Sequence, residues 1–149
     1  MSFMPAPPDM STESSPLAPR KVSFGEAISS FYKNYANFSG RASRSEFWYV
    51  ALFSAIVGGP LYILAYSTGT TDYYTGLPQP NGFWLTLYFL FVLANFIPNL
   101  ALTWRRLHDV DKSGGYYFIL LIPIVGAILL LIALCTDTKP SDNRFGPLN

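Results

Sequence analysis

Three stretches of twenty residues carry no charged side chain: residues 47–66, 83–102 and 116–135. An α-helix rises about 1.5 Å per residue, so each stretch makes a helix of about 30 Å, the thickness of a bilayer's hydrocarbon core. Only 13% of the 149 residues are charged, against about 25% in a soluble domain, and so short a chain cannot cover three such helices with polar surface. The sequence predicts an all-α integral membrane protein with three transmembrane helices.

The residues before the first apolar stretch fall into two parts. Residues 1–20 contain five prolines and few large apolar side chains, a composition that favours a disordered tail. Residues 21–149 are expected to form a single membrane domain.

An amphipathic helix is predicted directly after the tail. Ser23 and Glu26 have the spacing of a capping box, which marks the start of a helix. Two placements remain open: flat in the membrane interface, or packed against the cytoplasmic ends of the spans. The apolar face recurs at helical spacing and consists of Phe24, Ala27, Ile28, Phe31, Tyr35 and Phe38.

Prolines and amides interrupt the apolar stretches. In the second, Pro98 frees the carbonyl of Ala94, and Asn95 and Asn99 need hydrogen-bond partners in hydrocarbon. We expect both asparagines to face other helices, as candidate intramembrane polar residues; a substrate-binding break is the less favoured alternative. In the third stretch, Pro123 and Gly126 raise the idea of a re-entrant hairpin. Twenty residues are too few for two crossings, so one kinked crossing is predicted.

The basic residues predict the topology. Two lie beyond the third stretch, Lys139 and Arg144, and the segments before the first and after the second hold eight. Positive-inside counting therefore predicts a cytoplasmic N-terminus and an external C-terminus. The eight are Arg20, Lys21, Lys33, Arg41, Arg44, Arg105, Arg106 and Lys112.

Two charged clusters flank the spans on the predicted cytoplasmic face. They form a candidate patch that could hold an anionic lipid headgroup or a partner protein. The plainer interpretation is that the arginines anchor the topology, that Glu46 with Ser43 caps the first span, and that His108 makes a hydrogen bond. We expect the clusters to meet, with Glu46 or Asp109 paired to an arginine. The patch comprises Arg41, Arg44, Glu46, Arg105, Arg106, His108 and Asp109.

Four sequence blocks resemble a known family: residues 34–48, residues 105–114, Ile122-Pro123 with Gly126, and residues 143–146. They are similar to the YhaH-like inner-membrane proteins, the domain-of-unknown-function family 805, over residues 24–147. The resemblance implies a multi-pass protein of the bacterial cytoplasmic membrane with no assigned activity. On the predicted topology, residues 143–146 face away from the other blocks.

No catalytic, cofactor-binding or metal-binding residue is predicted, since none of the familiar motifs occurs. The net charge of +1 argues against nucleic acid as a partner. The lipid bilayer is the expected environment, with a membrane protein or a second copy as possible partners. The first hypothesis for function is an interaction or scaffold protein. The second is a component that handles a small solute or lipid, and the third is a lipid-headgroup enzyme using His108 and Asp109 as acid and base.

Three structural features would distinguish these hypotheses. A water-filled cavity reaching Asn95 and Asn99 would favour transport. A cytoplasmic pocket joining His108, Asp109 and Glu46 would favour catalysis, and a closed bundle with neither would favour the scaffold.

Overall fold

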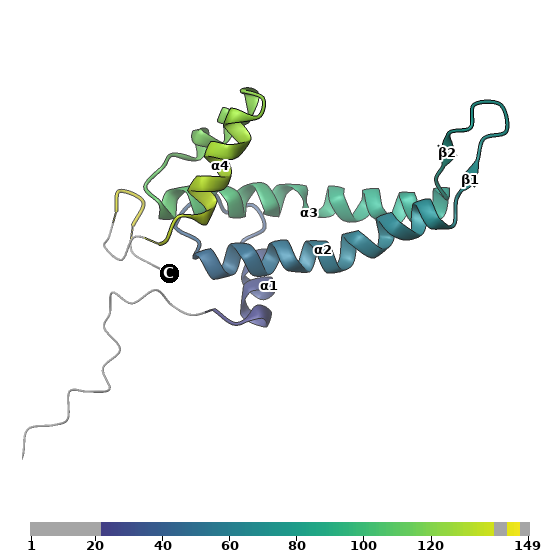
Figure 1. The fold of residues 1–149 in the computed structure, drawn as a ribbon. Coiled ribbons are helices and arrows are strands. Elements are labelled where there is room, and N and C mark those ends of the chain that lie inside the picture. Colours follow the sequence, from purple (N-terminus) through teal and green to yellow (C-terminus); the bar gives the residue numbers. More distant parts are fainter. Residues whose placement is uncertain (1–21, 139–142, 147–149) are drawn as a thin grey trace, which may run out of the picture.

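The structure is a computed structural model that describes residues 22–138 and 143–146 (Figure 1). The predicted disordered tail lies outside these residues. Helices dominate the described part, and a short two-stranded ribbon joins the two longest. In chain order the elements are α1 (Phe24–Lys33), α2 (Arg44–Ser67), β1 (Thr70–Thr71), β2 (Pro78–Gln79), α3 (Gly82–Asp109), the 3-10 helix η2 (Gly114–Leu121) and α4 (Val125–Cys135).

Helices α2 and α3 run antiparallel side by side and form the long axis of the molecule (Figure 1). Their 24 and 28 residues correspond to about 36 and 42 Å, enough to cross a bilayer. Only 11% and 22% of their most apolar windows are buried. A helix in the core of a soluble protein would be mostly buried, so these exposed apolar surfaces fit a lipid environment. The first two predicted helices are confirmed.

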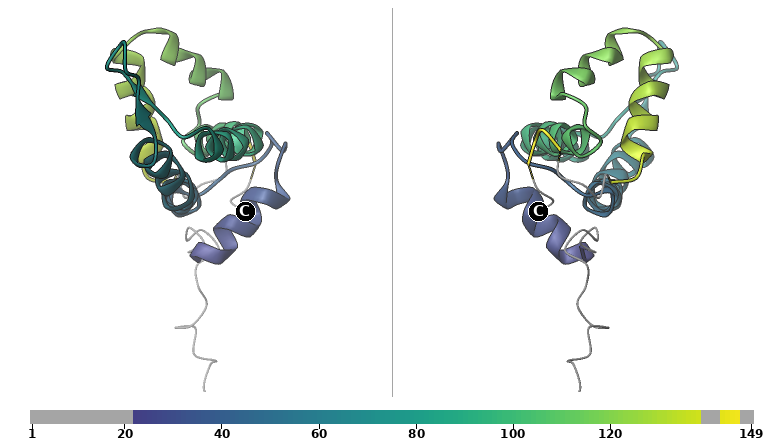
Figure 2. Two further views of the ribbon diagram at one scale, coloured as in Figure 1. Left: turned by 90° about the vertical axis from the view of Figure 1, so that its right-hand side faces the viewer. Right: turned by 90° about the vertical axis from the view of Figure 1, so that its left-hand side faces the viewer.

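Helix α1 crosses beneath α2 and α3, as the end-on views show (Figure 2). The predicted capping box is present, because Ser23 and Glu26 each bond the other's backbone N–H. Ala27 and Phe31 are fully buried. Of the two placements left open, the structure shows α1 packed against α2 and α3, and its place relative to the membrane interface stays a prediction.

The third apolar stretch differs from the prediction. The structure contains no continuous helix over 116–135; η2 and α4 instead form a helical hairpin that turns at residues 122–124 (Figure 1). Ile124 has φ of 63° at the turn, and Gly126 lies so close to η2 that a Cβ there would be 1.8 Å from the Ile119 carbonyl oxygen. Both ends of the hairpin lie beside the end of α3, so it returns to where it began.

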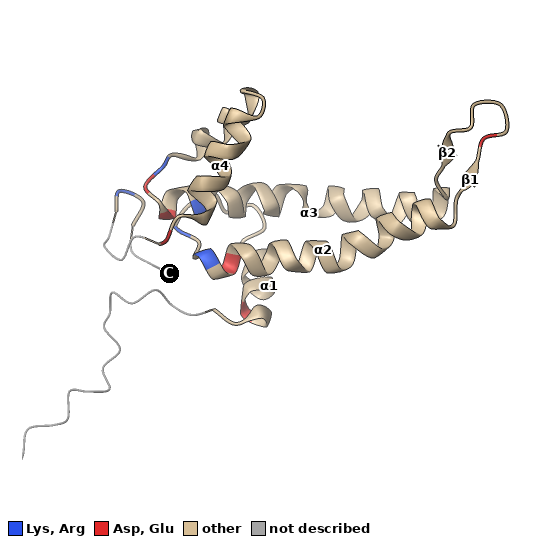
Figure 3. Cartoon of the chain, in the orientation of Figure 1, with Lys and Arg blue, Asp and Glu red and all other residues tan. Residues whose placement is uncertain are grey.

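Charges are distributed unevenly between the two ends of the molecule (Figure 3). The described Lys and Arg residues gather toward the end where α2 begins and α3 finishes. The opposite end, with β1 and β2, carries Asp72. Hydrogen bonds from the backbone and side chain of Thr75 hold the pKa of Asp72 below its ordinary value, since they stabilise the carboxylate.

Candidate functional site

A charged clamp of five residues, Arg41, Glu46, Arg105, Arg106 and Asp109, joins the start of α2 to the end of α3. Its centre is Asp109, which is fully buried. The Arg41 Nε donates to the Asp109 Oδ1 over 3.0 Å, and the Arg106 Nη1 donates to the Asp109 Oδ2. Each carboxylate oxygen accepts from a different guanidinium, so the buried negative charge is balanced on both sides.

Arg106 also holds the end of α4 at the clamp. Its Nε donates to the carbonyl of Leu134 over 3.2 Å, and its Nη2 donates to the carbonyl of Thr136. The last carbonyls of a helix lack partners within the helix and form the negative end of its dipole, so a guanidinium stabilises them. This contact explains why the hairpin returns to the end of α3.

Arg105 and Glu46 form the second arm of the clamp. The Arg105 Nη1 lies 3.5 Å from the Glu46 Oε1, which also accepts a 2.8 Å hydrogen bond from the Ser30 hydroxyl of α1. The Ser43 hydroxyl accepts from the backbone N–H of Glu46, so the predicted cap of α2 is confirmed. Glu46 therefore has a role beyond capping α2, because its side chain also contacts α1 and α3.

The segment 143–146 packs on the same end of α3. The His108 ring stacks on Phe145 with 3.9 Å between ring centroids, and its Nδ1 donates to the Gly40 carbonyl over 3.1 Å. The Asn143 amide donates to the His108 carbonyl over 2.8 Å. The prediction that this block faces away from the other charged blocks is wrong, because the hairpin brings the chain back.

The prediction that the two charged clusters meet is confirmed, but they meet inside the protein. Six of the seven patch residues are at most 8% exposed; the exception, Arg44, has a half-exposed side chain that pairs with Asp137. The clusters form the closed end of the bundle. With both Asp109 oxygens bound to guanidinium groups, the geometry does not favour acid and base chemistry by His108 and Asp109.

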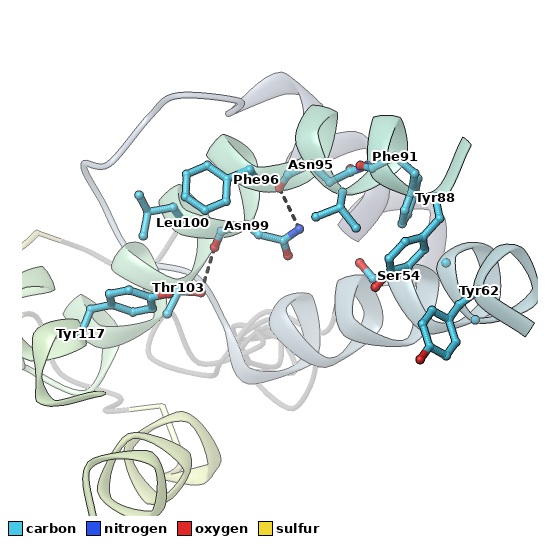
Figure 4. Close-up of a pocket in the computed structure, with 13 residues that line it drawn as sticks. Ser54, Tyr62, Tyr88, Phe91, Asn95, Phe96, Asn99, Leu100, Thr103 and Tyr117 are labelled. Atoms are coloured by element: carbon cyan, nitrogen blue, oxygen red, sulfur yellow. Dashed lines mark hydrogen bonds between the residues drawn. The ribbon is translucent and has the colours of Figure 1, made fainter. Parts of the chain in front are cut away.

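A cavity of about 510 Å³ lies between α2 and α3 on the side that faces the hairpin, and Tyr117 of η2 lines it (Figure 4). No charged residue of the described part of the chain lines it, and aromatic and aliphatic side chains form most of its wall. Its rim reaches the lipid-facing surface, where Phe96 is 59% exposed. The lining residues are Ser54, Gly58, Gly59, Tyr62, Tyr88, Phe91, Val92, Asn95, Phe96, Asn99, Leu100, Thr103 and Tyr117.

Asn95 and Asn99 lie on the wall of this cavity, and each binds the helix as well. The Asn95 amide nitrogen donates to the carbonyl of Phe91, and the Tyr32 hydroxyl donates to its amide oxygen over 3.0 Å. The Asn99 amide nitrogen donates to the carbonyl of Asn95 over 2.8 Å. The prediction that Asn95 faces another helix is confirmed, with α1 as the partner.

The carbonyl that Pro98 leaves without a helical donor finds a partner in the segment that follows α1. The Tyr35 hydroxyl donates to the Ala94 carbonyl over 2.8 Å. A carbonyl left without a donor in hydrocarbon would be costly, so Tyr35 makes the proline acceptable at this depth.

A second, smaller pocket of about 380 Å³ lies between α1 and α2, and Glu46 and Ser30 line it. His108 and Asp109 line neither this pocket nor the cavity between α2 and α3. Within residues 22–138 and 143–146, no three His, Cys, Asp or Glu side chains gather as metal ligands.

Comparisons with known proteins show to which family the chain belongs. A family model described as "Protein of unknown function (DUF805)" matches residues 35–147. The chain belongs to the DUF805 family. The inner membrane protein YhaI of Escherichia coli strain K12 is 39% identical over 117 residues, which are 78% of this chain and 89% of that protein. The inner membrane protein YhaH of the same strain is 34% identical over 117 residues, 77% of this chain and 88% of the relative. No solved structure matched.

The DUF805 match includes the whole charged clamp and every residue of the cavity wall, whereas α1 precedes it. Membership in a family whose relatives are named inner membrane proteins agrees with the exposed apolar surfaces of α2 and α3. The chain is a membrane protein.

Four residues of the site were not predicted from the sequence: Ser54, Thr103, Tyr32 and Tyr35. A signal for Ser54 existed, because it is the only serine or threonine within residues 47–66. Neither tyrosine could be assigned a partner, because the path of α1 beneath the spans follows from tertiary packing.

Proposed function

We propose that this protein binds a small, uncharged, membrane-dissolved molecule in the cavity between α2 and α3, as a lipid-handling component of the bacterial inner membrane. The observation that carries the proposal is the cavity itself, which reaches Asn95 and Asn99 and, among residues 22–138 and 143–146, is lined by no charged side chain. Ligand pockets in proteins are typically apolar with a few polar groups that orient the ligand. The opening toward lipid at Phe96 offers a route from the bilayer.

The same evidence favours binding over the scaffold hypothesis. A scaffold with a charged docking patch needs that patch at the surface, and the clamp residues are buried. The clamp instead supports the cavity, because it fixes the ends of α2, α3 and α4 relative to one another.

We further propose that α2 and α3 cross the membrane and that both termini are cytoplasmic. Support comes from the gathering of the described Lys and Arg residues at one end of the molecule, including Arg144, which pairs with Asp111 next to α3. On this proposal the hairpin of η2 and α4 enters the membrane and leaves it on the cytoplasmic side.

The binding proposal is tested by filling the cavity. Gly59 lines it, and a Cβ at Gly59 meets nothing within 4 Å, so Gly59→Leu adds a side chain to the cavity without a backbone clash. Protein purified from its native membrane in mild detergent is extracted, and the bound small molecules are identified by mass spectrometry. We expect a molecule that accompanies the wild-type protein to be lost from Gly59→Leu.

The matched control is Gly25→Leu, which makes the same change on α1, where a Cβ also meets nothing within 4 Å and the residue does not line the cavity between α2 and α3. This variant should retain the molecule. The same set of extracted molecules from wild type and Gly59→Leu would contradict the proposed function.

A further inference from the structure

Ser54 differs from the other hydroxyl-bearing residues on the helices. Thr86 and Thr103 on α3, and Thr68 and Thr136 directly after α2 and α4, each donate to the carbonyl four residues earlier, the usual arrangement for a hydroxyl in a membrane helix. The Ser54 hydroxyl is buried, and within the described chain it has no hydrogen-bond partner. A buried hydroxyl without a partner costs stability, which suggests that its partner is a molecule in the cavity.

Asn99 presents a complementary group from the opposite helix. Its amide nitrogen is engaged by the Asn95 carbonyl, and its amide oxygen is directed into the cavity, as Figure 4 shows beside Ser54. A serine hydroxyl turns about one side-chain bond, so Ser54 can reach a ligand that lies between the two helices. The cavity thus offers a free donor on α2 and a free acceptor on α3.

We propose that the occupant is an uncharged amphiphile whose head is a hydroxyl group, of the class of long-chain alcohols. This rests on the proposed function. One hydroxyl group can accept a hydrogen bond from the Ser54 hydroxyl and donate one to the Asn99 amide oxygen, so it pairs with the polar groups of both helices. An ester or ketone carbonyl can only accept a hydrogen bond, so it leaves the Asn99 amide oxygen without a donor. A carboxylate or phosphate would bring a charge into a cavity without a cation in its wall, where desolvation disfavours it.

The tail of such a molecule fits the remaining surface. Phe91, Phe96 and Leu100 line the cavity, and the opening at Phe96 lets a chain extend into the bilayer. Hydrocarbon gains little by leaving lipid for protein, so the hydroxyl head is what distinguishes this ligand from ordinary acyl chains.

Three probes with the same 16-carbon, diazirine-bearing tail test the inference: 1-hexadecanol, its methyl ether and palmitic acid. Each is photoactivated with the full-length protein in lipid nanodiscs, and labelled peptides are mapped by mass spectrometry. We expect the alcohol to label α2 and α3 at the cavity wall, in competition with unlabelled 1-hexadecanol. The ether should label it about fivefold less, the effect of about one hydrogen bond, and the acid at least as weakly as the ether, because its charge must be desolvated.

Two variants separate binding from folding. Ser54→Ala removes no internal hydrogen bond, so its thermal stability should equal or exceed that of wild type while alcohol labelling falls about fivefold. Gly59→Leu should abolish cavity labelling by all three probes.

The outcomes distinguish the inference from the proposed function. Equal labelling by the three probes that is lost in Gly59→Leu would overturn the hydroxyl-head inference and leave the cavity as a binding site. Stronger labelling by the acid would overturn it as well, and so would unchanged alcohol labelling in Ser54→Ala. No saturable labelling at the cavity wall by any probe would overturn both proposals.

Discussion

At the scale of single residues, most of the polar groups described above have a hydrogen-bond or ion-pair partner within the protein. Asp109 is fully buried between Arg41 and Arg106, and the Ala94 carbonyl is bound by Tyr35. Among the hydroxyls discussed, Ser54 alone has no partner in the part of the chain that the structure describes. Substitutions in the clamp should therefore change the free energy of unfolding, whereas a substitution at Ser54 should change ligand binding.

Because of the clamp, we expect Asp109→Asn to lower the free energy of unfolding strongly. The substitution leaves two buried guanidinium groups without their counter-charge, and breaking a buried pair costs about 3–5 kcal/mol. The free energy of unfolding in detergent measures it. Asp137→Asn is the matched control, because its pair with Arg44 is solvent-exposed and should contribute about 0–1 kcal/mol. Equal losses in the two variants would refute the clamp.

Tyr35→Phe should destabilise the protein because it removes the donor to the Ala94 carbonyl. The expected loss in unfolding free energy is about 1–2 kcal/mol. Tyr73→Phe, at a 92% exposed tyrosine, should be neutral. Adding Pro98→Ala to Tyr35→Phe restores a backbone N–H for Ala94 and should recover part of the loss. If it recovers none, the hydroxyl acts through packing instead.

At the scale of elements, the sequence predicted α1, α2 and α3 because their signals are local: capping residues, apolar periodicity and unbroken apolar length. The hairpin of η2 and α4 was considered from Pro123 and Gly126 but rejected, because its twenty apolar residues have the length of one crossing. Its fold depends on two distant contacts, Arg106 with the end of α4 and Gly114 beneath the Trp104 ring. No sequence pattern predicts either contact.

The hairpin predicts that Gly126→Ala is destabilising. The added Cβ would overlap the Ile119 carbonyl oxygen, so the two short helices must separate, at an expected cost of about 1–3 kcal/mol. Thermal melting in detergent should show a lower midpoint. In Gly115→Ala the nearest atom is the Ser113 Oγ at 3.7 Å, and no fall is expected. A midpoint for Gly126→Ala equal to that of Gly115→Ala would mean that η2 and α4 do not pack closely.

At the scale of the whole molecule, the two crossings and the hairpin place the two charged clusters and residues 143–146 at the same end. The positive-inside count agrees better with this arrangement than with three crossings, because Arg144 joins the other basic residues. We expect a reporter fused after Asn149 to be cytoplasmic and one inserted between Tyr73 and Tyr74 to be external. An external reporter at Asn149 would restore the three-span prediction.

The central claim, that the cavity holds a specific molecule in the cell, is tested most directly by a photocrosslinking amino acid placed on its wall. Phe96 lines the cavity and Phe89, on the same helix, does not; their exposed fractions are 59% and 60%. Each is replaced in turn by p-benzoylphenylalanine, living cells are irradiated, and the adducts are weighed by mass spectrometry. We predict one discrete small adduct from position 96 and a mixture of bilayer phospholipids from position 89; the same phospholipid mixture from both positions would contradict the account.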